Sequence, residues 1–387
     1  MSDFNHVNQL LQDFVARGLP GCALAVAREG RILYQGYHGM ASIEAQRPIA
    51  EDTVYRLYSM TKIIVCTAAL MLAERGKFLL NEPLYEYLPE YRHHTIASVG
   101  PDGKIRMAPS RGPMLIRHAF TMGVGLTYSF VPGPTTDEIE ALFKKLNVQH
   151  NGNFSLRELV CGLAGVPVAC EPGERFIYGY GHDLVAALIE AVSGKTVGAF
   201  LREELFQPLG MANTGYRYWG DIRERMASAY QLEAGKPPVL LHRKEVRHHE
   251  PDARFESGGS GLFSTLGDYL IFAQMLAAGG TFNNQRIISR KTIDLMRQNQ
   301  LKGDVLARFW NAYNVGYGYG LGVRTMLDTA AAGANNTQGA FGWSGALGTW
   351  VEVDPSEGLA VVYMHQADPN LEEYHHLRVR AAVYGAL

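Results

Sequence analysis

The feature that most constrains the fold of this chain is a pair of alternating apolar segments near its opposite ends. Residues 22–39 and 349–366 each contain two runs of alternating apolar residues, separated by Arg-Glu-Gly in the first and by Asp-Pro-Ser-Glu-Gly in the second. This pattern is typical of a β-hairpin. Two terminal hairpins pair most simply in one antiparallel sheet, so the segments between them become an insertion.

Most of the intervening segments are predicted to be helical. Residues 61–76, 137–148, 155–165 and 181–194 carry apolar residues three and four positions apart, which is the spacing of an amphipathic helix. We therefore expect an α/β fold of the α+β type. An antiparallel sheet built from both chain ends is flanked by helices and carries a mostly helical inserted domain.

The expected domain boundaries follow from this organisation. Residues 1–80 and 185–387 are expected to form the α/β domain, and residues 81–184 the helical one, with the functional site at their junction. Within the insertion, residues 95–135 are richer in Gly, Pro and Met. This segment is interpreted as loop that either covers a site or forms a solvated linker.

Charge and composition exclude several classes of partner. The 36 Lys and Arg balance 38 Asp and Glu, so the net charge of −2 gives no electrostatic reason to bind nucleic acid or an anionic membrane. No window approaches the roughly 18 apolar residues that span a bilayer. The first 18 residues are amphipathic and the four cysteines form no C-x-x-C pair, so we expect a cytoplasmic protein with reduced thiols.

The most informative short segment contains Ser59 and Lys62 at the start of an apolar helix. A Ser at a helix N-terminus meets the positive end of the helix dipole, and a Lys three residues later lies on the same face. If that Lys is buried, its pKa falls until it can accept the Ser proton. The alternative is a helix cap beside a solvated Lys. Residues 63–72 are apolar nearly all round, which favours a buried helix and a buried Lys62.

With these residues the chain resembles the serine β-lactamase and penicillin-binding protein superfamily, and within it the class C-like esterases called family VIII carboxylesterases. The resemblance covers most of the chain. Its three motifs fall in order on Ser59 and Lys62, on Tyr178 after a Pro-Gly turn, and on Trp343, Ser344 and Gly345. Three motifs in the right order are far more specific than any one of them. The resemblance implies a β-lactamase-like fold.

The resemblance also implies roles for these residues. Ser59 would attack an ester or amide carbonyl, and Lys62 and Tyr178 would share the proton transfer. Which of the two accepts the proton first stays open, because interacting groups titrate as a unit. The backbone N–H groups of Ser59 and Ala346 would form the oxyanion hole. Without the motif context, Tyr178 is better explained as a buried aromatic residue.

Two departures from the penicillin-recognising pattern bear on the substrate. Tyr180 stands in place of the Asn of the second motif, and Trp343 in place of the Lys of the third. That Lys presents a cation to a substrate carboxylate, whereas an indole offers apolar surface and one N–H donor. We therefore expect Trp343, Ser344, Gly345 and Tyr180 to bind an uncharged ester. For Gly345, a glycine at a bend in the sheet is the alternative.

Other motif-like segments are assigned no chemistry. Residues 193–196 have the tail of a P-loop but end a helix, and no Ser satisfies G-x-S-x-G. The histidine pairs 93–94, 248–249 and 375–376 lack the spacing of a zinc site and are interpreted as solvated or loop histidines. We expect neither cofactor nor metal.

The predicted function is that of a serine carboxylesterase that cleaves small or medium esters through an acyl-Ser59 intermediate. The alternatives within the superfamily are a β-lactamase, a D-aminopeptidase or amidase, and an acyltransferase. A catalytically silent binding protein is the alternative from another class, but it has no need of Ser59, Lys62 and Tyr178 together. The expected partner is a small ester, with no nucleic acid and no membrane; the sequence leaves the oligomeric state open.

Overall fold

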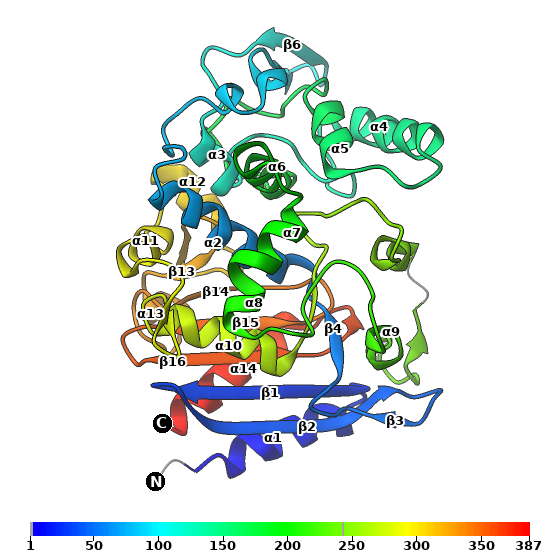
Figure 1. Ribbon diagram of the computed structural model, residues 1–387, viewed down its shortest axis with the longest axis vertical. Helices are drawn as coiled ribbons and strands as arrows, with labels where there is room; N and C mark the ends of the chain where they lie inside the picture. The colour runs from blue at the N-terminus through cyan, green and yellow to red at the C-terminus, as the bar shows by residue number, and fades with distance from the viewer. Residues whose placement is uncertain (1–2, 242–243) are drawn as a thin grey trace.

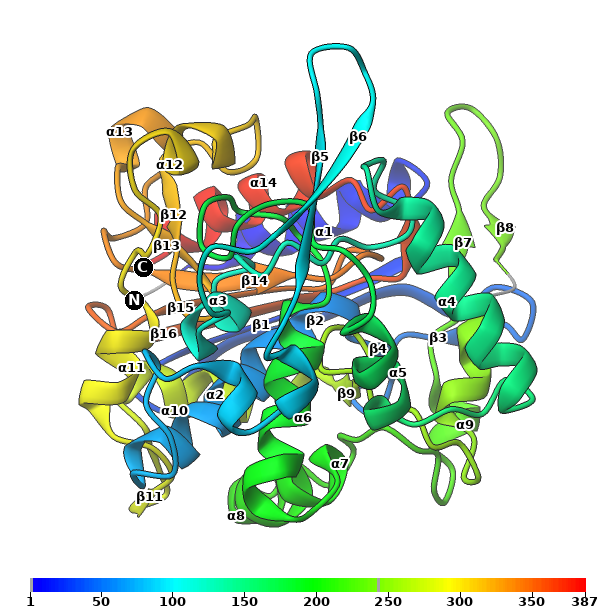
Figure 2. The same ribbon diagram turned by 90° about the horizontal axis from the view of Figure 1, so that it is seen from above.

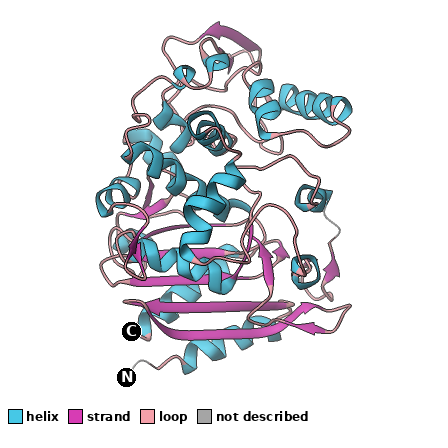
Figure 3. Ribbon diagram, viewed as in Figure 1, coloured by secondary structure: helices cyan, strands magenta, loops and turns pink. Residues whose placement is uncertain are grey.

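The centre of the fold is an eight-stranded antiparallel sheet made from both ends of the chain (Figures 1 and 3). The computed structural model describes residues 3–241 and 244–387. Strand β1 (Gly21–Arg28) pairs with β16 (Leu359–Met364), so the two terminal hairpins lie side by side as predicted. The strand order is β12-β13-β14-β15-β16-β1-β2-β3. The other strands are β2 (Arg31–Ser42), β3 (Arg47–Pro48), β12 (Tyr317–Tyr319), β13 (Arg324–Met326), β14 (Phe341–Ser344) and β15 (Trp350–Asp354).

The two faces of the sheet pack against different helices, because alternate residues of a strand point to opposite sides. Ala23 and Ala25 of β1 belong to the large core beneath α10 (Leu266–Ala277). Leu24 of β1 belongs to a second core with α1 (Asn5–Ala16) and α14 (Glu372–Gly385). Figure 2 shows α1 and α14 on one side of the sheet and α10 on the other. The predicted class of fold is thereby confirmed.

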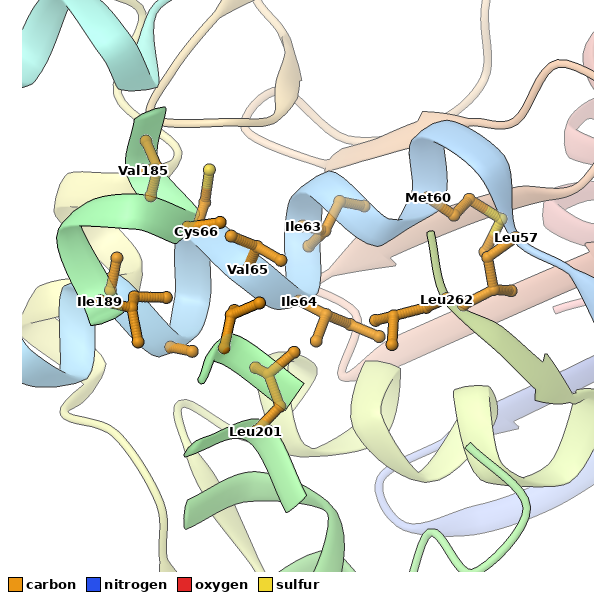
Figure 4. Close-up of a cluster of buried hydrophobic side chains, with 14 of the residues drawn as sticks. Leu57, Met60, Ile63, Ile64, Val65, Cys66, Val185, Ile189, Leu201 and Leu262 are labelled. Carbon is orange, nitrogen blue, oxygen red and sulfur yellow. The ribbon is translucent and has the colours of Figure 1, made fainter. Parts of the chain in front are cut away.

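Helix α2 (Thr61–Glu74) is the buried centre of the helical layer. All of its residues from 61 to 72 are buried, so the expectation of an apolar helix with a buried Lys62 is correct. It packs against α6 (Gly181–Ser193). Figure 4 shows its side chains gathered with those of α6 and with Leu201 of α7 (Val197–Leu201). This packing holds the first two motifs next to each other.

The segment predicted as loop, residues 95–135, contains more structure than expected. It includes a hairpin of β5 (Thr95–Val99) and β6 (Ile105–Pro109) and the short helix α3 (Ile116–Phe120). The turn residue Gly103 has a φ of 76°, which the absence of a side chain permits. Figure 2 shows this hairpin projecting from the body of the molecule. The loop prediction is wrong for the hairpin, because its cross-strand pairing was masked by a Gly- and Pro-rich composition.

The remaining elements complete the helical layer and the edges. The division into residues 1–80 with 185–387 and residues 81–184 stays a prediction. Among the described residues, no single helix meets the length and composition of a membrane span, although the bent pair Gly181–Ser193 and Val197–Leu209 meets them jointly. The elements not yet named are β4 (Val54–Arg56), η1 (Tyr58–Met60), η2 (Leu84–Glu86), η3 (Pro89–Tyr91), α4 (Thr136–Gln149), α5 (Leu156–Leu163), η4 (Arg202–Phe206), α8 (Gln207–Leu209), α9 (Ile222–Arg225), β7 (Tyr230–Gln231), β8 (Val239–Leu240), η5 (Lys244–His249), β9 (Phe263–Thr265), β10 (Thr281–Phe282), β11 (Gln285–Arg286), α11 (Arg290–Met296), α12 (Gly303–Phe309), α13 (Thr329–Ala332) and β17 (Ala367–Asp368).

The histidine pairs are less exposed than predicted. His249, His375 and His376 are all buried. The two on α14 face the sheet, where His376 stacks on Trp350 at a ring distance of 5.5 Å and His375 packs on Phe14 at 4.2 Å. The interpretation as solvated or loop histidines is therefore wrong for His375 and His376, because α14 is the helix that covers this face. His249 ends η5 and is buried against Phe263. The four cysteines are free thiols, as expected.

Candidate active site

Ser59 lies on a short 3-10 turn, η1, directly before α2. The residue before it, Tyr58, has a φ of 46°, a left-handed conformation that a bulky side chain rarely adopts. Such strained backbone is concentrated at functional sites, where the surrounding structure holds it. Here the Thr349 hydroxyl donates to the carbonyl oxygen of Leu57 at 3.1 Å. The backbone before Ser59 is therefore fixed to the loop that follows the third motif.

Lys62 is completely buried and its amino group has three partners. Its Nζ lies 3.1 Å from Ser59 Oγ, 3.2 Å from Tyr128 Oη and 2.6 Å from the carbonyl oxygen of Gly259. An ammonium group has three N–H donors and no acceptor. The three oxygens match these donors one for one, and one of them is the hydroxyl of Ser59.

Tyr178 is the second side chain in contact with Ser59. Its Oη lies 2.6 Å from Ser59 Oγ, and Lys62 Nζ lies 4.7 Å from the centroid of its ring. The indole N–H of Trp343 donates to Tyr178 Oη at 3.2 Å. Because an indole nitrogen can only donate, the Tyr178 oxygen accepts this bond. Tyr178 Oη is therefore held between Ser59 Oγ and the indole N–H of Trp343.

The support for Lys62 was not predicted from the sequence. Gly259, whose carbonyl accepts from Lys62, is held by Ser257 Oγ, which accepts from Gly259 N at 3.1 Å and donates to Asp183 at 2.8 Å. Burial and the neighbouring Asp183 raise the pKa of Tyr128 well above its usual value of 10, so Tyr128 stays a neutral phenol. The available sequence signals for this support were a Gly-Gly pair after a Ser and an Asp five residues after Tyr178.

The side chains expected to bind substrate take more varied positions. Tyr180 is buried and packs on Tyr128 at a ring distance of 4.8 Å, so it forms the wall behind the site. The hydroxyl of Ser344 donates to Glu372 of α14 at 2.9 Å, on the other face of the sheet from Trp343. A Cβ at Gly345 would lie 2.3 Å from the carbonyl oxygen of Leu57. The lack of a side chain there allows the third motif to pack against η1.

Ala346 lies in a tight turn after Gly345. The turn is closed by Gly348 N, which donates to Gly345 O at 2.9 Å, and by Gly345 N, which donates to Thr349 O at 2.8 Å. Within the described chain, no backbone carbonyl accepts from Ala346 N–H. This N–H is therefore available to a ligand, as an oxyanion hole requires. The roles of Ala346 and of the other site residues stay predictions.

The fold, a buried Lys beside a Ser at the start of the central helix, and a Tyr in contact with that Ser define an enzyme of the serine β-lactamase superfamily. The chain belongs to the β-lactamase family, whose sequence model, described as Beta-lactamase, matches residues 7–386. The resemblance seen in the sequence is thereby confirmed.

Individual relatives extend over nearly the whole chain. Esterase EstB of Burkholderia gladioli is 29% identical, over 90% of this chain and 86% of its own length. Monacolin J acid methylbutanoyltransferase of Aspergillus terreus is 24% identical, over 92% of this chain and 88% of its own length. Among solved structures, EstCE1, described as a hydrolase with promiscuous acyltransferase activity, superposes with a TM-score of 0.81 at 25% identity, covering 98% of this chain and 97% of that one. These relatives therefore include an esterase, an acyltransferase and a hydrolase with acyltransferase activity.

Proposed function

We propose that this protein is a carboxylesterase that hydrolyses small or medium, uncharged esters through an acyl-Ser59 intermediate. The observation that carries the proposal is the position of Ser59 Oγ, 3.1 Å from Lys62 Nζ and 2.6 Å from Tyr178 Oη. A nucleophile in contact with both a lysine amino group and a tyrosine oxygen has the proton-transfer partners that acyl transfer requires. The 29% identity to an esterase supports the same activity.

The chemistry follows from these contacts. Ser59 Oγ attacks the ester carbonyl carbon while its proton passes to the Lys62 and Tyr178 pair, and the carbonyl oxygen becomes an oxyanion at the N–H groups of Ser59 and Ala346. The oxyanion then collapses, the bond to the alkoxy oxygen breaks, and the leaving alcohol takes the proton from the pair. Water repeats the sequence on the acyl-enzyme, which releases the acid and restores Ser59.

The preference for uncharged substrates rests on Trp343. Where the penicillin-recognising pattern has a Lys, the N–H of this indole is already engaged by Tyr178. Phe130, 76% exposed, stacks on Tyr128 at 5.1 Å and adds apolar surface beside that ring. An ester with an apolar acyl group gains from these contacts, whereas a substrate carboxylate meets no Lys at the third motif.

Acyl transfer to an alcohol is the second candidate. A relative over 92% of this chain is named a methylbutanoyltransferase, and EstCE1 is described as having acyltransferase activity. The same acyl-Ser59 serves both reactions, and the choice depends on whether water or an alcohol reaches it first. The ratio of ester to acid formed from a vinyl ester in the presence of added alcohol measures this partition.

The decisive experiment combines active-site labelling with a substrate panel. A fluorophosphonate probe is expected to label the peptide that contains Ser59 in the wild type and to leave Ser59→Ala unlabelled. p-Nitrophenyl esters of graded acyl length, tested beside nitrocefin, are expected to be cleaved faster than nitrocefin. Labelling of Ser260 or Ser344, or nitrocefin turnover equal to that of the best ester, would contradict the proposal.

A further inference from the structure

The turn that carries Ala346 is anchored from the opposite face of the sheet. At its end, the carbonyl oxygen of Gly348 accepts a hydrogen bond from Nε2 of His376, 3.0 Å away on the buried side of α14. Gly348 has a φ of 99°, and a Cβ there would lie 1.7 Å from Nε2 of His365. The backbone of the turn therefore packs directly on two buried imidazoles.

The geometry assigns the tautomer of His376. A carbonyl oxygen only accepts, so Nε2, which faces Gly348 O, carries the proton. In a neutral imidazole the other nitrogen is then an acceptor. That nitrogen, Nδ1, lies 2.8 Å from Tyr313 Oη, so the Tyr313 hydroxyl donates to it. His376 is thereby oriented from both sides.

The chain of hydrogen bonds continues to a buried cation. Arg324 Nη2 donates to Tyr313 Oη at 3.3 Å, and the guanidinium lies 4.2 Å from the centroid of the Tyr313 ring. The bonds run in one direction, from Arg324 through Tyr313 and His376 to Gly348 O. Hydrogen bonds aligned in this way polarise and strengthen one another in a buried environment.

A second contact from α14 holds the strand before the turn. Glu372, four residues before His376 and so on the same face of the helix, accepts from the Ser344 hydroxyl at 2.9 Å. Ser344 ends β14, and Gly348 closes the turn. Helix α14 thus holds both ends of the segment in which Ala346 N–H is exposed.

We propose that His376 is a positioning residue for the oxyanion hole: through its bond to Gly348 O, it fixes the turn that directs Ala346 N–H toward the carbonyl oxygen of the substrate. This inference rests on the proposed function, because it assigns Ala346 N–H to the developing oxyanion. His376 itself touches neither substrate nor Ser59. Its contribution is to restrict the motion of a donor whose direction determines how well it stabilises the transition state.

Two substitutions of His376 separate its hydrogen bond from its volume. The amide nitrogen of Gln can occupy the place of Nε2, so His376→Gln keeps a donor to Gly348 O. The amide nitrogen of Asn can reach only the place of Nδ1, so His376→Asn loses that donor. His375→Asn is the matched control, because His375 is also buried on α14 but packs on Phe14.

The readout compares p-nitrophenyl butyrate with its thiono analogue, in which C=S replaces C=O. Sulfur is a weak hydrogen-bond acceptor, so the thiono ester gains little from the oxyanion hole. Removing one oxyanion donor costs about 10²- to 10³-fold in kcat. A donor that is displaced rather than removed loses only part of this stabilisation of the transition state. His376→Asn is therefore expected to lower kcat for the ester about 10- to 100-fold, with KM little changed. The thiono ester is expected to lose less than threefold.

His376→Gln and His375→Asn are expected to stay within about threefold of the wild type for both substrates. Tyr313→Phe, which removes only one hydroxyl, tests the network if His376→Asn fails to fold; its expected loss is smaller, about 3- to 10-fold, and is again confined to the ester. Equal kcat in the Asn variant and the wild type, or an equal loss on both substrates, would overturn the inference. A wild type that cleaves no ester would overturn the proposed function, and the inference would fall with it.

Discussion

The front and the back of the candidate active site are built in different ways. At the front, Ser59 and Lys62 lie at the start of α2, Tyr178 lies just before α6, and the polar atoms of Lys62 and Tyr178 both lie within 3.1 Å of Ser59 Oγ. At the back, buried polar groups of β13, β15 and α14 meet across the opposite face of the sheet and contact the segment behind the site at Gly348 and Ser344. Substrate chemistry constrains the front, whereas the need to pair buried polar groups constrains the back.

The largest expected loss of activity comes from substitutions at the front. Ser59→Ala is expected to lower kcat for p-nitrophenyl butyrate by at least about 10⁴-fold, and Lys62→Ala and Tyr178→Phe by about 10³-fold each, because these residues act as a unit. For the same reason, the Lys62→Ala/Tyr178→Phe double variant is expected to lose little more than either single variant. Stopped-flow and steady-state hydrolysis measure these ratios. A Ser59→Ala enzyme with more than a tenth of wild-type activity would remove the nucleophile assignment.

The sequence predicted the front well because its residues follow a short spacing and a recognisable order. Ser59 and Lys62 are three residues apart, and the apolar residues of α2 indicated that Lys62 is buried. The terminal hairpins likewise predicted the sheet. These signals are local, or they repeat with the period of a strand or helix.

The back could not be predicted in this way. His376 and Gly348 are 28 residues apart, and Tyr313 and His376 are 63 apart. No period or spacing connects them, and a His on a short C-terminal helix has the same composition whether it faces solvent or the sheet. Lys62 shows the same limit: its Ser59 partner was predicted, but its contact with Gly259, 197 residues away, was not.

A substitution in the back is expected to change stability rather than chemistry. Glu352 of β15 and Arg380 of α14 form an ion pair at 3.1 Å with both side chains 3% exposed. Glu352→Gln leaves the guanidinium buried without its counter-charge, which costs about 3 to 5 kcal/mol in the free energy of unfolding. Urea denaturation measures this loss, and kcat of the folded fraction is expected to stay near that of the wild type.

The exposed pair between Arg28 and Glu357 is the matched control. These side chains are about one-third exposed, so Glu357→Gln is expected to cost less than about 1 kcal/mol. Similar losses for Glu352→Gln and Glu357→Gln would mean that burial does not distinguish the two pairs. A large fall in kcat of Glu352→Gln would instead place this ion pair in the chemistry.

Trp343 belongs to the front, where it contacts Tyr178, and its replacement sharpens the comparison. Trp343→Phe keeps an aromatic ring but removes the donor to Tyr178 Oη. A hydrogen bond contributes about 0.5 to 1.5 kcal/mol, so kcat for p-nitrophenyl butyrate is expected to fall about 2- to 10-fold. Trp343→Lys restores a donor and adds a cation, and is expected to shift relative kcat/KM toward nitrocefin. Unchanged kcat in Trp343→Phe would show that Tyr178 does not need this donor.

The smallest expected effect is a loss of folding stability at acidic pH. It distinguishes the contribution of His376 from those of the other buried polar groups at the back. Burial, together with the charges of Arg324, His375 and Arg380, lowers the pKa of His376 well below 6.5. The unfolded chain therefore binds a proton near pH 6.5 that the folded chain does not bind, so stability decreases as the pH falls below about 6.5.

Between pH 7 and pH 5.5 one such histidine accounts for about 1 kcal/mol of lost stability. Glu372, whose pKa is raised by burial, shifts stability in the opposite sense, and the lowered pKa values of His365 and His375 act in the same sense as that of His376, so the total for the wild type mixes several groups. The difference between the wild type and His376→Gln isolates the imidazole, since Gln does not titrate. We expect the wild type to lose about 1 kcal/mol more than His376→Gln over this range in urea titrations. Equal losses would mean that the folded protein protonates His376 as readily as the unfolded chain does, and the bond from Nε2 to Gly348 O would then not depend on a neutral imidazole.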